Sequence, residues 1–111
     1  MMRIARKPEE DAGAPVTTLF AEGDVPGGRA SFGIAVLPPG DRIPASGVSV
    51  HADCDEYTYV VKGTALVHVQ GETVRLHPGD GLLIPAGAAH WALNDGDAPL
   101  EVVWALVQRG R

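Results

Sequence analysis

The feature that most constrains this sequence is the spacing of its glycines, prolines, asparagines and aspartates, which divide residues 29–107 into short apolar runs. These residue types form turns and end strands, so runs of this length favour antiparallel strands. No segment has a convincing helical period. We therefore predict an all-β, antiparallel sandwich or barrel. Its strands are expected at residues 29–37, 48–51, 56–61, 65–69, 72–76, 81–84, 89–93 and 101–107.

The first 28 residues follow a different pattern. Residues 7–15 have no hydrophobic period and contain two prolines, which indicates a tail or an extended arm. We expect a short edge strand at 16–21 and a turn at 23–28. The chain of 111 residues is then divided into an arm over 1–28 and one barrel domain over 29–111. Within the barrel, Gln70-Gly71 predicts a tight hairpin.

Charge and hydropathy exclude several classes of partner. The formal net charge is −5 and no cluster of Lys and Arg offsets it, so binding to nucleic acid is not expected. No apolar run approaches the roughly 18 residues that cross a bilayer, and the N-terminus is charged. A single cysteine, Cys54, excludes an internal disulfide. These observations predict a cytoplasmic protein that has no membrane partner.

Residues 79–94 combine turn chemistry with a histidine. Gly79 can take a positive φ, Pro85 ends a strand, and Gly87 permits the reversal that brings His90 back. A histidine that follows a reversal so closely lies at the rim of a sheet, where a ligand can reach it.

The spacing of this segment resembles the second motif of the cupin superfamily. That motif, Gly-x5-Pro-x-Gly-x2-His-x3-Asn, is met at every position, by Gly79, Pro85, Gly87, His90 and Asn94. The family consists of small β-barrels that commonly hold a divalent metal. The resemblance covers roughly residues 34–107 and implies a cupin-type barrel, which is a jelly roll or double-stranded β-helix.

The first cupin motif, Gly-x5-His-x-His-x3,4-Glu-x6-Gly, is met in part. Glu56 and Gly63 have the right spacing, and His51 falls on the second histidine. Ser49 takes the place of the first histidine, and the opening glycine is displaced to Gly47.

The resemblance implies a metal site formed by His51, Glu56 and His90. The first two residues are five apart, so they converge only if residues 52–55 form a turn, which Asp53 and Asp55 favour. Two imidazoles and one carboxylate bind one divalent transition metal and leave positions open. Iron, manganese, nickel, copper and zinc all fit. Ser49 would hold a water near the ion, or mark a vacant ligand position that weakens metal binding.

Each of these residues also has a purely structural interpretation. A histidine on a strand is more often structural than a ligand, although a buried Glu56 is costly unless it is paired or metal-bound. Cys54 is interpreted as a turn cysteine, with a reactive thiol as the alternative. Asn94 is expected to bond the backbone near His90. The remaining residues are assigned to the surface (His68, His77), to packing (Trp91, Trp104) or to weak anchoring of an anionic substrate (Arg29, Arg42).

Alternation assigns the faces of the strands. If Glu56, Thr58 and Val60 face the interior, an apolar stripe faces outward, formed by Tyr57, Tyr59 and Val61. We predict that a second subunit covers this stripe in a homodimer; the N-terminal arm is the alternative cover. The same rule turns a second group of residues inward, comprising Ala65, Val67, Val69, Val74 and Leu76.

The resemblance favours a metal-dependent enzyme that acts on a small polar metabolite. Dioxygenase, isomerase, decarboxylase and lyase chemistry all occur in the family, and the fold does not choose among them. One alternative is a non-catalytic module that binds or senses a small ligand with weak metal or none. Another is a structural dimerisation domain, which predicts an interior filled by side chains.

Overall fold

A computed structural model describes residues 2–8 and 15–110. In chain order, the elements are β1 (Val16–Phe20), a 3-10 turn η1 (Glu22–Asp24), β2 (Ala30–Leu37), β3 (Arg42–Ile43), β4 (Cys54–Lys62), β5 (Ala65–Val69), β6 (Glu72–Leu76), β7 (Gly81–Ile84), β8 (His90–Leu93) and β9 (Leu100–Gln108). No helix in these residues is long and apolar enough to span a bilayer. The predicted all-β, antiparallel architecture is confirmed.

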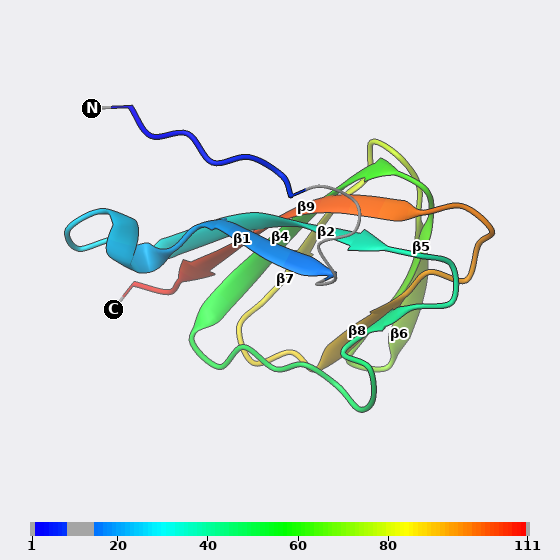
Figure 1. Cartoon of the computed structure of the whole chain (residues 1–111). Coiled ribbons are helices and arrows are strands. Elements are labelled where there is room, and N and C mark those ends of the chain that lie inside the picture. The colour runs from blue at the N-terminus through cyan, green and yellow to red at the C-terminus, as the bar shows by residue number, and fades with distance from the viewer. Residues whose placement is uncertain (1, 9–14, 111) are drawn as a thin grey trace.

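Two sheets form the layers of a jelly roll (Figure 1). One contains five strands in the order β1-β2-β9-β4-β7, and the other contains four in the order β3-β8-β5-β6. All their pairings are antiparallel, and β9 lies centrally between β2 and β4. The tight turn between β5 and β6 is also confirmed, because Gln70 and Gly71 both have positive φ, of 43° and 86°.

The core lies between the two sheets and follows the predicted alternation. Val60 is fully buried, and Leu37 and Leu100 are each 1% exposed. Thr58 and Val60 face the interior with Glu56, as expected. Tyr57, Tyr59 and Val61 point outward and are 41% to 50% exposed. Inward strand positions therefore supply a continuous apolar wall, closed at one end by Leu37 and Leu100.

Two predicted details of the strands are wrong. Residues 48–51 form no strand; Ser49 makes one isolated bridge to His90, while Val48 and Val50 are each 53% exposed. Residues 42–43, which were not expected to pair, form β3 beside β8. A segment forms a strand only where a neighbouring strand has a free edge to pair with. The β-branched residues Val48 and Val50 favour a strand but do not supply that edge.

Val74, which was predicted to face inward, is more exposed than expected. Val74 lies opposite Val67 and shares its face, but it is 44% exposed, whereas Leu76 is 6% exposed. Both residues lie on the last strand of the sheet, but Leu76 packs in the core cluster with Ala65 and Val67, and Val74 does not belong to that cluster.

Gly33 makes room for a tryptophan in the wall. It pairs with Trp104 across β2 and β9, and a β-carbon added to Gly33 would lie 2.5 Å from Cζ2 of the indole. The same atom would lie 2.0 Å from the carbonyl oxygen of Thr17. The indole therefore occupies the space that a side chain at position 33 would take.

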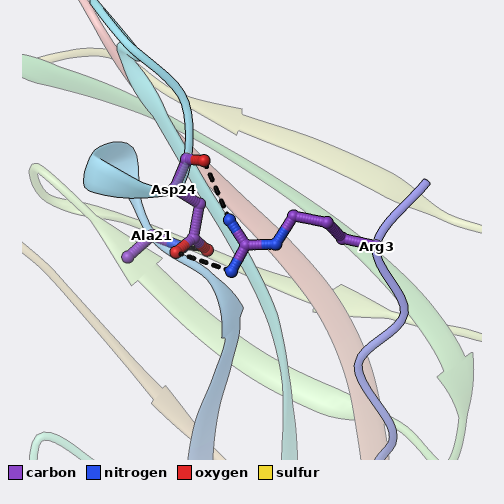
Figure 2. Close-up of polar contacts among 3 residues, drawn as sticks. All are labelled: Arg3, Ala21 and Asp24. Atoms are coloured by element: carbon purple, nitrogen blue, oxygen red, sulfur yellow. Dashed lines mark hydrogen bonds and ion pairs between the residues drawn. The ribbon is translucent and has the colours of Figure 1, made fainter. Parts of the chain in front are cut away.

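The described part of the N-terminal arm, residues 2–8, lies alongside the barrel without regular structure. Arg3 donates to the carbonyl oxygen of Asp24 at 2.8 Å and lies 3.5 Å from its carboxylate (Figure 2). Lys7 pairs with Glu101 of β9 at 2.8 Å. The arm is thus held at two points, while Tyr57 and Tyr59 stay 49% and 50% exposed. The expected strand at 16–21 is present as β1, and the division at residue 28 stays a prediction.

Candidate metal centre

Three predicted ligands meet at one end of the barrel. One ligand atom from each of His51, Glu56 and His90 lies within 4.8 Å of the other two. Glu56 belongs to β4, His90 opens β8, and His51 lies in the loop between β3 and β4. The three side chains therefore come from different segments and converge only in the folded chain.

The loop before β4 brings His51 to the site through backbone hydrogen bonds. Ser49 and His90 exchange two bonds, of 2.8 and 3.0 Å, so their backbones lie directly opposite each other. The carbonyl oxygen of His51 then accepts a bond from the N–H of Gly87 at 2.8 Å. Residues 52–53 form the required bend, which is shorter than the predicted turn over 52–55 because residues 54–55 already belong to β4. Gly87 of the second motif thus holds the backbone of His51, which belongs to the first motif, in place.

The carboxylate oxygen lies at the distance from each imidazole nitrogen that two donors around one ion require. Oε1 of Glu56 lies 3.3 Å from Nε2 of His51 and 3.5 Å from Nε2 of His90. Donors bound at about 2.1 Å to a common ion lie roughly 3.0 to 3.5 Å apart. The spacing and the donor set, two imidazole nitrogens and one carboxylate oxygen, therefore fit a divalent transition metal.

Neighbouring groups orient the two most buried donors. Nδ1 of His90 donates to the carbonyl oxygen of Ala88 at 2.9 Å, which leaves Nε2 to face the site. Thr58 donates from its hydroxyl to Oε2 of Glu56 at 3.0 Å, so Oε1 is the oxygen turned toward the histidines. Thr58 is a positioning residue that motif spacing did not reveal; its place two residues after Glu56 on an inward face was the available signal.

The protonation states of the pair are coupled. Burial is the largest single influence on Glu56 and opposes its ionisation, but the contacts with His90, Thr58 and His51 together outweigh burial and lower the pKa of the carboxyl. The contact with Glu56 raises the pKa of His90 despite its burial. Below that raised pKa, His90 holds a proton that a metal ion has to displace.

A cavity of about 210 Å³ extends from these ligands into the barrel. Ser49 lines it together with all three predicted ligands. An interior filled by side chains was expected of a purely structural domain, so the cavity contradicts that alternative.

Other predicted residues lie away from the cavity. Neither Arg29 nor Arg42 lines it, so neither is placed to anchor a bound anion. Arg42 instead packs over the ring of Trp91 at 5.0 Å. His68 is not a free surface residue, since it stacks on Trp91 at 5.3 Å and bonds to Thr73. His77 is exposed, as predicted.

Cys54 is the first residue of β4 and not a turn residue, which corrects the prediction. Burial, with the nearby acids Glu22, Asp53 and Asp55, raises the pKa of its thiol. A raised pKa disfavours the nucleophilic thiolate, so the alternative of a reactive cysteine is not supported.

Asp55 was predicted as a turn former, but it belongs to β4, where its carboxylate anchors the loop beside the site. Its carboxylate accepts bonds from the N–H of Ala86 at 2.8 Å and from Nε of Arg109 at 3.0 Å. The backbone bond and Arg109 together lower the pKa of this carboxyl. The turn that precedes His90 is therefore tied both to β4 and to the end of the chain.

The fold and the site define a jelly-roll barrel with a candidate metal centre at the open end of an apolar cavity. Residues 33–106 match the cupin domain family, which is more than half of the chain. The chain belongs to this family, which confirms the predicted resemblance.

Two curated relatives come from Streptomyces. The chain is 32% identical over 100 residues to the polyketide synthase CurC of Streptomyces cyaneus, a match that covers 90% of this chain and 63% of CurC. It is 28% identical over 99 residues to the tetracenomycin polyketide synthase protein TcmJ of Streptomyces glaucescens, covering 89% and 64%. The chain thus spans slightly less than two thirds of the length of these relatives.

A solved structure shares the fold. A protein of Thermotoga maritima described as a predicted oxalate decarboxylase superposes with a TM-score of 0.76 at 24% identity. The match covers 85% of this chain and 79% of that one. At this identity the likeness supports the architecture alone.

Proposed function

We propose that this chain is a metal-dependent enzyme that holds one divalent transition metal ion through His51, Glu56 and His90. The observation that carries the proposal is the convergence of three ligand atoms at the open end of a cavity. Three protein ligands leave positions for water or substrate, which is typical of catalytic sites more than of structural ones. The bound ion would supply Lewis-acid chemistry, or oxygen activation if it is iron.

The residues of the chain have distinct parts in this proposal. Thr58 holds the carboxylate of Glu56 in place, and the carbonyl oxygen of Ala88 keeps the proton of His90 on Nδ1. The apolar wall excludes water from the rest of the cavity and so strengthens electrostatic interactions at the site. The Streptomyces relatives are named as polyketide synthase proteins, which supports an oxygen-bearing carbon chain or ring as substrate.

The proposal predicts one bound ion per chain and an affinity that rises with pH. Cobalt(II) titrated into chelator-treated protein, followed by its visible absorption, measures both. Because His90 has to lose a proton, the affinity should increase about tenfold for each pH unit below its raised pKa and level off above it. Protein that takes up no cobalt at any pH would leave the non-catalytic ligand-binding module as the better account, consistent with Ser49 at the first histidine position.

We also propose that a second copy of the chain covers the outer face of β4 and β7. Tyr57, Tyr59, Val61 and Leu83 are between 41% and 55% exposed, and Tyr57 pairs directly with Leu83. The described arm residues leave this apolar surface open, and such surfaces commonly mark subunit interfaces.

Sedimentation equilibrium at micromolar concentrations should therefore give twice the mass of the chain. Tyr59→Asp, which places a charge within the surface, should shift the equilibrium toward monomer at least about tenfold. Val74→Asp, on the exposed edge of the other sheet, is the matched control and should leave the mass unchanged. A wild-type chain that sediments as a monomer throughout would refute the dimer.

A further inference from the structure

The cavity runs inward from the candidate metal centre. Along β4, Glu56 lines its open end and Val60 its deep end, which are about 13 Å apart at the usual rise of a strand. The side chain of His51 is 34% exposed, whereas Leu37 and Leu100 at the opposite end are each 1% exposed. A molecule that enters beside the ligands therefore has only one direction in which to extend.

The lining changes character along this direction. Polar side chains gather at the open end, where Ser49 and Thr58 accompany the three candidate ligands. The rest of the wall is aliphatic apart from Trp104, whose Nε1 is buried and has no hydrogen-bond partner in the part of the chain that the structure describes. Because that nitrogen has under 1 Å² of accessible surface, the described residues that line the deep cavity present no accessible side-chain donor to a ligand.

Such a wall discriminates against polar molecules. Burying a hydroxyl group without a hydrogen-bond partner costs roughly 1 to 3 kcal/mol in proteins. Among residues 2–8 and 15–110, the only charged side chains that line the cavity are the candidate ligands at its open end. A sugar or a dicarboxylate would leave several polar groups unpaired, so the lining disagrees with the small polar metabolite expected from the sequence.

The volume limits the size of the occupant. An apolar cavity of roughly 150 Å³ accommodates benzene. A cavity of about 210 Å³ therefore holds one six-membered ring, or an aliphatic group of similar bulk, together with a small polar head. A longer molecule would have only one end inside the barrel.

We propose that the site binds a compact molecule with two adjacent oxygen donors at one end and an apolar body of about one ring at the other. The oxygens bind the metal ion and the body fills the deep cavity. Ser49, where the family motif has a histidine, leaves room for the second oxygen. This inference rests on the proposed metal centre, and it adds the chemical class of the substrate.

Two hydroxamates that share a chelating head test the inference. Acetohydroxamate carries a methyl group and benzohydroxamate carries a phenyl ring, so their affinities for cobalt-loaded protein differ mainly through the apolar body. Calorimetry should show benzohydroxamate binding 10- to 100-fold more tightly. Ala35→Leu, which fills the deep end from β2, should remove this advantage and leave the affinity for acetohydroxamate unchanged.

Further variants keep the test decisive. Ala92→Leu fills the cavity from the other sheet and replaces Ala35→Leu if that variant does not fold. Ala30→Leu, at an exposed position of β2, is the control and should behave like wild type. Equal affinities for the two hydroxamates in cobalt-loaded protein, or an advantage that survives both filling variants, would overturn this inference alone. Failure to take up cobalt would overturn the proposed metal centre as well.

Discussion

Replacing Glu56 by alanine is expected to lower the affinity for a divalent ion at least about 100-fold. Its Oε1 is the anionic donor of the candidate centre and lies 3.3 and 3.5 Å from the two imidazole nitrogens. Without the carboxylate, a doubly charged ion would rest on two neutral imidazoles beside an apolar wall, where an uncompensated charge is very costly. Even residues that only orient ligands typically change metal affinity by 10- to 100-fold. Cobalt titration of the purified variant measures the loss.

Two companion variants separate the loss of a ligand from the loss of the fold. Glu56→Gln keeps the shape of the side chain and an oxygen that can accept the bond from Thr58, yet it removes the charge. It should also lose the ion while retaining the circular dichroism of wild type. Glu72→Ala removes an exposed glutamate from β6 and should bind normally. If Glu56→Ala binds cobalt as tightly as wild type, the three residues do not form the metal centre.

Much of the site could be predicted because the positions of His90 and Glu56 depend on residues close to them in the sequence. In residues 79–94, Gly79 and Gly87 take positive φ of 94° and 86°, so glycine is required where the chain turns. The resulting reversals place His90 at the open end of the barrel. The alternation along β4 likewise determined that Glu56 would face inward. In both cases, residues close in sequence determine where the side chain points.

The remaining features depend on contacts between distant segments. Val48 and Val50 favour a strand by residue type, but only Ser49 between them finds a partner, because β3 already pairs with β8 nearby. The apolar cavity was equally hidden, because its volume depends on how side chains from two sheets meet. Small residues such as Ala35 and Ala92, which leave that space open, are common in ordinary cores as well.

Asn94→Ala should destabilise the barrel by about 3 to 5 kcal/mol, a large share of the roughly 5 to 15 kcal/mol that typical domains have. Asn94 is completely buried just beyond β8. Its Nδ2 donates to the carbonyl oxygens of Leu37 at 2.8 Å and Ala98 at 2.9 Å, and its Oδ1 accepts from the N–H of Gly96 at 3.0 Å. The expected role in bonding the backbone is confirmed, but the partners are distant from His90.

The size of this effect follows from what alanine would leave behind. The carbonyl oxygen of Leu37 would remain buried without its partner, and each such unsatisfied group costs about 1 to 3 kcal/mol. Loss of the side chain also removes the link between the end of β2 and the loop before β9. That link closes the barrel at the end opposite the candidate metal centre, so its loss should lower stability without removing any ligand.

Urea denaturation, monitored by circular dichroism, measures the change in the free energy of unfolding. Asp97→Ala is the matched control, because it removes an exposed polar side chain from the same loop and should change stability by less than about 0.5 kcal/mol. The fraction of Asn94→Ala that remains folded should still bind cobalt, because all three candidate ligands are intact. A loss of stability below about 1 kcal/mol would show that water replaces the three hydrogen bonds, and that Asn94 does not hold this end of the barrel closed.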